Sequence, residues 1–385
     1  GGKCNTEEDF YKACRAASIL GTLQAGYTDF KFLTDTSKLI FDREALLGVS
    51  ITGWMNNPDI LFNERVLQKG AEIVKEVNKE VAKVIGINAA ARTTCVKPSG
   101  NASVLLQTAS GIHAEHSNMY IRNVQMNKES EITQAIMKTN PYMVEDSVWS
   151  AGGTDVVVSF PILPKKGSLY KDDLLGVKHL ELVKKAQKYW VEAGTNEDLC
   201  ADKGVRHNVS NTIIVDDWDN VERYVFENRH SFAGISFLAM SGDKDYNQAP
   251  NTAVITAKDM VKKYGNAAIF ASGMVVDALK VFNTLWDACA TAKGFGEDIS
   301  LETSENAMKR DWLRRFKKFG DNYLNSDSDV AEHCLKDAYL LHKWNKIQST
   351  LKTVDWKEDI KERKYTDVDT LAAAACAGGA CEIDF

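Results

Sequence analysis

Residues 94–103 read Thr-Cys-Val-Lys-Pro-Ser-Gly-Asn-Ala-Ser, a short β-like run that leads into a loop of small residues. Small side chains let backbone N–H groups approach an anion, and a helix that begins in such a loop adds further unpaired N–H groups. The loop is therefore a candidate phosphate-binding site that needs no lysine, with serine hydroxyls as additional donors. An ordinary strand-to-helix turn has the same composition, so the residues alone leave both interpretations open. The candidate residues are Pro98, Ser99, Gly100, Asn101, Ala102 and Ser103.

Helical and β-strand patterns alternate on both sides of this loop. Asn5 or Thr6 can cap a helix that ends near Gly26, and a long amphipathic helix is expected over about 62 to 86. Residues 155–162 have the continuous β-branched character of a strand that is buried on both faces. This alternation indicates an α/β fold with a largely parallel sheet. Further strands are expected at 208–215 and 233–238, further helices at 174–190 and after Asp217, and a mostly helical part from about 257 that includes Trp312, Phe316 and Phe319.

The overall composition is that of a globular chain of 385 residues, with 44% hydrophobic and 26% charged residues. No stretch approaches the roughly 18–20 apolar residues of a membrane span. The net charge is −6, from 47 basic and 53 acidic side chains, which disfavours binding to a nucleic-acid backbone but leaves a small anionic ligand possible. Six of the eight cysteines are scattered singly, as in reduced cytosolic proteins. We therefore expect a cytoplasmic protein with neither a membrane nor a nucleic-acid partner.

The other two cysteines, Cys376 and Cys381, lie close together near the C-terminus. Four residues separate them, two of which are glycine, so the thiols can close a disulfide easily. Alanine- and glycine-rich flanks predict a flexible tail over 356–385, on which a dithiol could reduce a buried disulfide by exchange and then be reduced again. The alternative is an unstructured terminus with incidental cysteines.

Several common cofactor motifs are absent from the sequence. It contains neither the glycine-rich dinucleotide fingerprint nor a P-loop. The segment His113-Ala114-Glu115-His116 lacks the spacing of a zinc metalloprotease helix, and no two cysteine pairs have zinc-finger spacing. We therefore predict no metal site.

Four stretches together resemble the C-terminal part of the catalytic chain of ribonucleotide reductases, and most closely the adenosylcobalamin-dependent (class II) branch. The resemblance covers almost the whole chain, and its second and fourth stretches are the most specific. The stretches are Ile19–Gln24 with Thr28–Phe30 and Leu46–Gly53; Thr94–Gly100 with Ala109–His113 and Tyr120–Arg122; Asn208–Ser210 with Thr212; and Cys376–Cys381 followed by Glu382 and Ile383.

The resemblance implies a fold and a chemistry. Residues 1–355 would form the C-terminal half of a ten-stranded α/β barrel with helical additions. The loop from Pro98 to Ser103 would hold the phosphates of a ribonucleotide substrate, although the family often has threonine where Asn101 stands. Cys376 and Cys381 would be the redox shuttle dithiol that carries electrons from thioredoxin or a similar reductant. Adenosylcobalamin would be the cofactor of the complete enzyme, which reduces ribonucleoside di- or triphosphates to 2′-deoxyribonucleotides by thiyl-radical chemistry.

The chain also departs from the family pattern. It has no asparagine-x-cysteine-x-glutamate motif for the thiyl radical, so we expect it to need the N-terminal half of the reductase as a partner and to be inactive without it. Cys4 lies directly before the first helix, where the family has a variable linker, and is not assigned a reducing role. No two tyrosines are adjacent, unlike in the diiron (class I) branch, and no glycyl-radical motif is present. The alternatives are a class I catalytic subunit and a non-catalytic nucleotide-binding fragment of a split reductase.

Overall fold

The computed structural model describes residues 1–240, 248–265, 268, 271–272 and 328–356. The chain divides into two compact units, one made of Gly1–Asn118 and Pro164–Asp243, the other of Met119–Leu163 and Lys244–Phe385. The predicted helical residues Trp312, Phe316 and Phe319 lie outside the described residues, as do Cys376 and Cys381. The tail that begins near 356 therefore stays a prediction.

Four short strands of the first unit form a parallel row. β1 (Val49–Ser50) pairs with β2 (Thr94–Cys95), and β6 (Thr212–Val215) pairs with β7 (Ser236–Ala239). A parallel bridge between Val96 and Val209 joins the two pairs. The row therefore runs in the order β1, β2, β6, β7, and the predicted parallel arrangement is confirmed for this unit.

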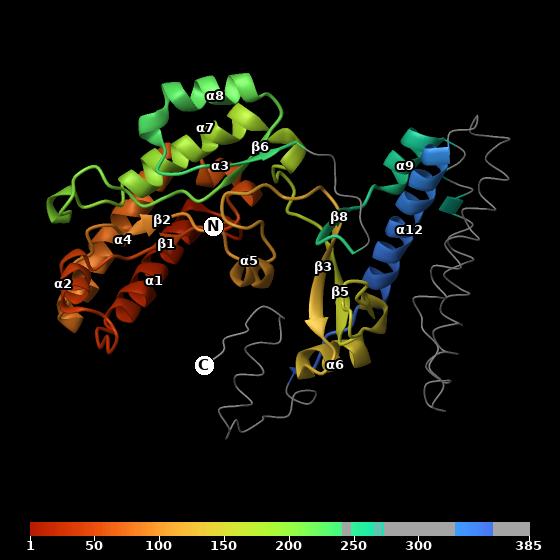
Figure 1. The fold of residues 1–385 in the computed structure, drawn as a ribbon, viewed down its shortest axis with the longest axis horizontal. Helices are drawn as coiled ribbons and strands as arrows, with labels where there is room; N and C mark the ends of the chain where they lie inside the picture. Colours follow the sequence, from red (N-terminus) through yellow and green to blue (C-terminus); the bar gives the residue numbers. More distant parts are fainter. Residues whose placement is uncertain (241–247, 266–267, 269–270, 273–327, 357–385) are drawn as a thin grey trace. The chain divides into compact units, whose positions relative to one another are not determined.

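Helices pack against this row (Figure 1). The contacts are those of α1 with β1 and α4, of the π-helical turn η4 with β2 and α4, and of α7 with β6 and α8. α1 begins with the expected cap: Asp9 N–H donates to Thr6 Oγ1, and Thr6 N–H donates to Asp9 Oδ2, each at 3.1 Å. The bounds are Glu7–Ala25 for α1, Glu64–Ile85 for α4, Gly176–Ala186 for α7, Gln187–Glu192 for η4 and Trp218–Glu227 for α8.

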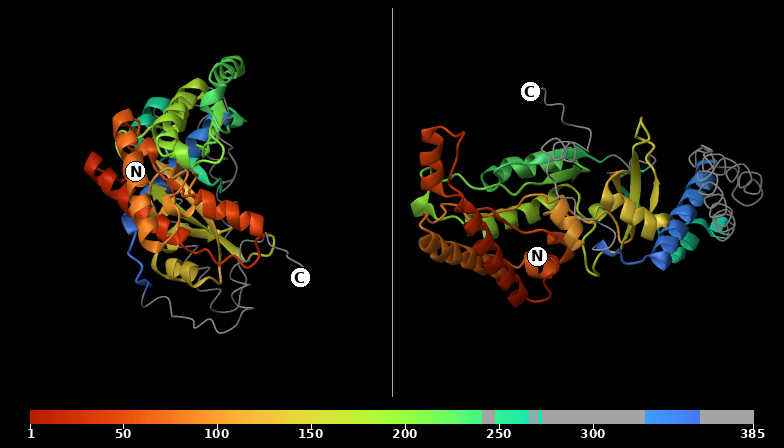
Figure 2. Two further views of the ribbon diagram at one scale, coloured as in Figure 1. Left: turned by 90° about the vertical axis from the view of Figure 1, so that its left-hand side faces the viewer. Right: turned by 90° about the horizontal axis from the view of Figure 1, so that it is seen from below.

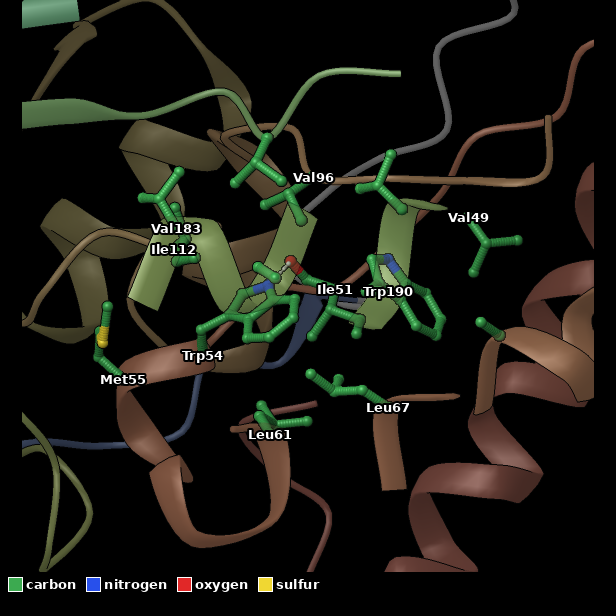
Figure 3. Packing of buried hydrophobic residues seen from close by; sticks show 14 of the residues in the cluster. Val49, Ile51, Trp54, Met55, Leu61, Leu67, Val96, Ile112, Val183 and Trp190 are labelled. Carbon is green, nitrogen blue, oxygen red and sulfur yellow. Dashed lines mark hydrogen bonds between the residues drawn. The ribbon is translucent and has the colours of Figure 1, made fainter. Parts of the chain in front are cut away.

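Two tryptophans form the centre of the core between the strands and helices (Figure 3). Trp54 and Trp190 are both fully buried. Each indole N–H has a partner: Trp54 Nε1 donates to Ile51 O at 3.1 Å, and Trp190 Nε1 donates to Cys95 O at 3.0 Å. Because both acceptors lie on or beside strands of the row, the core fixes the ends of β1 and β2.

The two faces of the row differ. Side chains alternate along a strand, so Val49, Val96 and Ile213 point into the helical core. Their neighbours Ser50 and Cys95 lie on the other face, where Ser50 is exposed and Cys95 is half-buried. At β1 and β2, the face away from the helices therefore carries small side chains.

The second unit is built on an antiparallel sheet in the order β4, β5, β3, β8. The strands are β3 (Tyr120–Asn127), β4 (Val144–Asp146), β5 (Asp155–Ile162) and β8 (Asn251–Ala253). Its helices are α6 (Glu131–Thr139), α9 (Ala257–Tyr264) and α12 (Ser328–Thr350), and Figure 2 shows α9 beside α12.

The expected strand at 155–162 is present as β5 and is buried from Val156 to Ser159, but its direction corrects the prediction. It pairs antiparallel with both neighbours. A run of β-branched residues reports burial and carries no information on strand direction.

The remaining short elements complete the described fold. They are α2 (Asp35–Glu44), η1 (Trp54–Asn56), α3 (Pro58–Leu61), α5 (Asn101–Leu106), η2 (Pro141–Met143), η3 (Lys171–Asp173), η5 (Glu197–Leu199) and η6 (Arg229–Ser231). The described strands form no closed sheet, so the ten-stranded barrel is not confirmed. Within the described part of the chain, no helix has both the length and the apolar content that crossing a bilayer requires.

Candidate functional site

The predicted phosphate-binding loop follows β2 and runs into α5. Pro98 and Ser99 are half-buried, Gly100 and Ala102 are exposed, and Ser103 is buried. A Cβ atom added at Gly100 would meet no atom within 4 Å. The N–H groups at the start of α5 precede its first intrahelical bond. The loop therefore presents its backbone to open space at Gly100.

Thr52, two residues after β1, holds this loop from behind. Its hydroxyl lies 2.8 Å from Ser99 Oγ and 3.1 Å from the Ala109 carbonyl oxygen, and it accepts a hydrogen bond from Gly111 N–H at 3.1 Å. A hydroxyl has one hydrogen and two lone pairs. Thr52 therefore donates to Ala109, Ser99 donates to Thr52, and the bonding capacity of Thr52 is full.

Ser110 makes a reciprocal pair with the loop backbone. Ser99 N–H donates to Ser110 Oγ at 2.8 Å, and that hydroxyl donates to Ser99 O at 3.0 Å. Ser103 Oγ donates to the carbonyl oxygens of Ser99 and, at 3.1 Å, Gly100. The Ser99 and Ser103 hydroxyls are therefore bonded within the protein, in contrast to the expectation that they add donors for an anion.

Two glycines in left-handed backbone conformation allow three segments to approach each other: the one after β1, the Pro98–Ser103 loop, and the turn that contains Thr108 and Gly111. Gly53 has φ of +74°, and an added Cβ would lie 2.9 Å from the Thr108 Cβ. Gly111 has φ of +54°, and an added Cβ would lie 3.1 Å from Lys97 O and 3.3 Å from Pro98 Cα. Only glycine adopts this conformation freely while leaving that space empty.

A buried polar pair supports the turn behind the loop. Asn56 Oδ1 accepts from Ala109 N–H at 2.8 Å, and Asn56 Nδ2 donates to Glu115 Oε1 at 2.6 Å and to Ser168 Oγ at 3.1 Å. Both Asn56 and Glu115 are buried. These hydrogen bonds fix the positions of Asn56, Glu115 and the Ala109 backbone, because breaking one of them would leave a polar group unpaired in the interior.

Three histidines of the first unit bond to main-chain groups near the site. His113 Nδ1 lies 3.0 Å from Ser110 O, His179 Nε2 lies 2.9 Å from Ile112 O, and His207 Nδ1 lies 3.0 Å from Thr94 O. Burial lowers the pKa of all three rings, and for His179 to about 4. These histidines are therefore neutral at pH 7, and their ring nitrogens serve the backbone.

The thiols of Cys95, on β2, and Cys14, on α1, are not activated. Burial raises the pKa of Cys95 above its usual range and raises that of Cys14 to about 12. Both thiols therefore stay protonated at neutral pH. A cysteine acts as a nucleophile or a metal ligand only as the thiolate. In the described residues, no group of three or more His, Cys, Asp or Glu side chains could hold a metal ion.

The structure thus brings the predicted loop residues together with partners that the sequence did not identify. Thr52, Ser110, Asn56 and Glu115 had no assigned role, although Thr52 and Ser110 lie within stretches that carried the family resemblance. No spacing rule identifies them, because their contacts join segments far apart in the chain. The predicted dithiol, Cys376 and Cys381, lies outside the described residues and is not placed beside the loop.

Comparison with known proteins agrees with the resemblance. The chain is 28% identical over 191 residues to a probable adenosylcobalamin-dependent ribonucleoside-triphosphate reductase of Dictyostelium discoideum, covering 48% of this chain and 24% of the relative. It is 24% identical over 159 residues to an adenosylcobalamin-dependent ribonucleoside-triphosphate reductase of Euglena gracilis, covering 40% of this chain and 22% of the relative. No family model matches the chain.

A solved structure of a B12-dependent (class II) ribonucleotide reductase has a similar fold, with a TM-score of 0.52 and 16% identity over 64% of this chain and 36% of that one. The chain therefore resembles class II ribonucleotide reductases over part of its length, and the class I alternative is not favoured. It spans about a quarter of the length of the curated relatives it matches.

Proposed function

We propose that this chain is part of an adenosylcobalamin-dependent ribonucleotide reductase and that its Pro98–Ser103 loop holds the phosphates of the substrate. The observation that carries this proposal is the asymmetry of the loop. Thr52 and Ser110 bond it from behind, while its backbone at Gly100 meets open space. A loop fixed on one side and open on the other is prepared to bind a ligand without reorganising.

The proposed phosphate contacts come from backbone N–H groups of Gly100, Asn101 and Ala102. The hydroxyls of Ser99 and Ser103 instead hold the loop in shape, since both are bonded within the protein. Backbone amides bind phosphate without a local positive side chain. This arrangement accounts for phosphate binding in a chain with a net charge of −6.

The proposed reaction reduces a ribonucleoside triphosphate, the substrate class in the names of both curated relatives. A thiyl radical on reductase sequence that this chain does not span takes the ribose 3′-hydrogen and later returns it. The 2′-hydroxyl leaves as water, and a cysteine pair supplies two electrons by forming a disulfide. Cys376 and Cys381 then reduce that disulfide by thiol exchange and are themselves reduced by thioredoxin or a similar dithiol.

The cofactor supplies the radical in this proposal, but none of the described residues is assigned to it. Both ring nitrogens of His113, and one ring nitrogen each of His179 and His207, bond to main-chain groups, so these nitrogens would not be free to hold the cofactor. We therefore assign no cobalamin contact to these nitrogens.

We further propose that the parallel row is part of the ten-stranded barrel. β7 pairs with β6 on one side, and all four of its residues are exposed. Phe237 and Leu238 of this strand are apolar, which is unusual for an unpaired edge. Strands of the other half of the barrel would extend the row.

The proposed location of the protein is the cytoplasm, where dithiols are kept reduced. The five described cysteines are free thiols, as expected there.

The experiment mixes the full chain with the reductase segment that carries the thiyl motif, adenosylcobalamin, a ribonucleoside triphosphate and thioredoxin. We expect deoxynucleotide to form only when both polypeptides are present. The Cys376→Ser variant should complete a single turnover but lose multiple turnover with thioredoxin, because its product disulfide cannot be reduced again. A folded mixture that forms no deoxynucleotide supports the non-catalytic alternative, and unchanged steady-state activity of Cys376→Ser excludes the shuttle role.

A further inference from the structure

The turn from Ser110 to His113 connects the Pro98–Ser103 loop to strand β6 through hydrogen bonds. On one side, the Ser110 hydroxyl bonds both the N–H and the carbonyl oxygen of Ser99. On the other side, the His113 ring bonds Ser110 O through Nδ1 at 3.0 Å and Thr212 N through Nε2 at 3.1 Å. Thr212 is the first residue of β6. A continuous path of hydrogen bonds therefore runs from the sheet to the loop.

This path specifies the protonation state of His113. The Thr212 N–H is a donor, so Nε2 of His113 must carry a lone pair and accept. The Ser110 carbonyl oxygen is an acceptor, so Nδ1 must carry the proton. Only the neutral ring with its proton on Nδ1 makes both bonds. In a protonated ring, Nε2–H would face Thr212 N–H, and that bond would be lost.

We propose that His113 is a positioning residue, which in its neutral form holds the Pro98–Ser103 loop in its anion-binding shape through Ser110. The proposal rests on the proposed function of the loop and deepens it by adding a dependence on pH. His113 does not touch the ligand. It fixes Ser110, and Ser110 fixes the backbone of Ser99 directly before the exposed Gly100.

The groups around His113 favour its neutral form. From α7, His179 is neutral and donates Nε2–H to Ile112 O, so the turn is held by a second histidine. Glu115, in the same segment, is bonded to Asn56, and the side chain of Lys97 is exposed. Burial is the main cause that lowers the pKa of His113, and the smaller, opposing effect is its hydrogen bond to the Ser110 carbonyl oxygen.

The direction of the pH effect follows from this shift. Because the folded state disfavours the imidazolium ion, the stability contributed by His113 is complete above the ordinary histidine pKa of about 6.5. This contribution to stability is lost as the pH falls from about 6.5 through the lower pKa of His113 in the folded state. The loop should therefore keep its shape at neutral pH and lose it in mild acid.

The first test needs no ligand and no variant. Nitrogen-15 NMR of the full chain should show His113 with its proton on Nδ1 and a pKa below the usual range. The amide of Ser99 should lose protection against hydrogen exchange as His113 becomes protonated, while the amide of Ala109, bonded to Asn56, should not. A His113 ring with its proton on Nε2, or a Ser99 amide whose protection does not follow His113, would overturn the proposal.

The second test measures binding of inorganic tripolyphosphate by calorimetry between about pH 7.5 and about pH 5.5. His113→Asn keeps a donor where Nδ1 stands, and His113→Gln keeps an acceptor where Nε2 stands, so each variant keeps one of the two bonds. We expect both to bind about tenfold more weakly than the wild type at neutral pH. Both should also lose the extra fall in affinity that the wild type shows in acid.

Because the probe itself titrates, proteins are compared with each other at each pH. The control is His230→Gln, which removes an exposed histidine far along the chain and should behave as the wild type. If the His113 variants bind tripolyphosphate with the affinity of the wild type and with the same dependence on pH, the proposal is wrong. If the wild type itself binds no tripolyphosphate, the proposed function of the loop fails, while the tautomer and the Ser99 exchange still decide the role of His113.

Discussion

The parallel row of the first unit and the antiparallel sheet of the second contain buried strands of similar character, yet only the first collects a candidate site. In the row, β1 and β2 run in the same direction, so the residues after them meet at one edge. Thr52 follows β1 and Ser99 follows β2, and their hydroxyls lie 2.8 Å apart. This is the general reason why ligands bind beyond the carboxyl ends of parallel strands.

The antiparallel sheet uses its buried polar groups differently. Ser159, in the middle of β5, donates to Asn123 Oδ1 on β3 at 2.9 Å, and Asn123 Nδ2 donates to Ala249 O at 2.8 Å. These bonds tie neighbouring strands to each other. Neighbouring strands of this sheet end at opposite edges, so the residues that follow two paired strands do not meet. In these two sheets, strand direction, more than burial, therefore determines where a site can form.

Substitution of Trp190 should destabilise the first unit strongly and leave the stability of the second unit unchanged. Trp190→Ala should lower the free energy of unfolding of the first unit by about 3–5 kcal/mol, because it empties a fully buried site and leaves Cys95 O without its donor. Chemical denaturation followed by residue-resolved hydrogen exchange measures this. The amide of Val158 in β5 should keep its protection, and Trp218→Ala, at a residue 53% exposed, should change little. Equal loss of protection in both units would contradict this separation.

A second pair of substitutions tests whether a hydrogen-bonded hydroxyl serves binding in one sheet and stability alone in the other. Thr52→Val keeps the shape of the side chain but removes the acceptor for Ser99 and Gly111, so it should cost about 1–3 kcal/mol and weaken tripolyphosphate binding about tenfold. Ser159→Ala removes the matching buried hydroxyl of β5 and should leave binding unchanged. Calorimetry and thermal unfolding of both variants check this. A binding loss in Ser159→Ala would show that the two sheets do not divide these roles.

The parts of this structure that local sequence determines were predicted well. Thr6 caps α1, which begins at Glu7 with an acidic first turn, and α4 follows its amphipathic pattern, because caps and periodicity act within a few residues. Both interpretations of the loop after β2 allowed a helix to start in it, and α5 begins there at Asn101. These signals needed no knowledge of the rest of the chain.

The parts that depend on distant residues were not predicted. Thr52 and Ser99 are 47 residues apart, and His113 and Thr212 are 99 apart, so ordinary residues gain their roles only when the strands pair. The antiparallel direction of β5 was missed for a related reason. It depends on β3, where Val124 and Met126 are the only apolar residues between Arg122 and Asn127, an alternation too short to identify a strand or its direction.

The smallest effect concerns the close approach of the turn to the loop. Gly111→Ala adds a Cβ in a left-handed backbone conformation, 3.1 Å from Lys97 O, so it should cost about 1–2 kcal/mol and push Pro98 outward. Binding of tripolyphosphate should weaken by a factor of about 3, which is less than the loss in Thr52→Val because every hydrogen bond keeps both partners. Gly86→Ala is the matched control, since Gly86 has φ of +79° and no atom within 4 Å of an added Cβ. It carries the same backbone strain at the end of α4, so it should lower the melting temperature similarly and leave binding intact. If both variants weaken binding equally, strain alone explains the effect, and the contact with Pro98 has no part in shaping the loop.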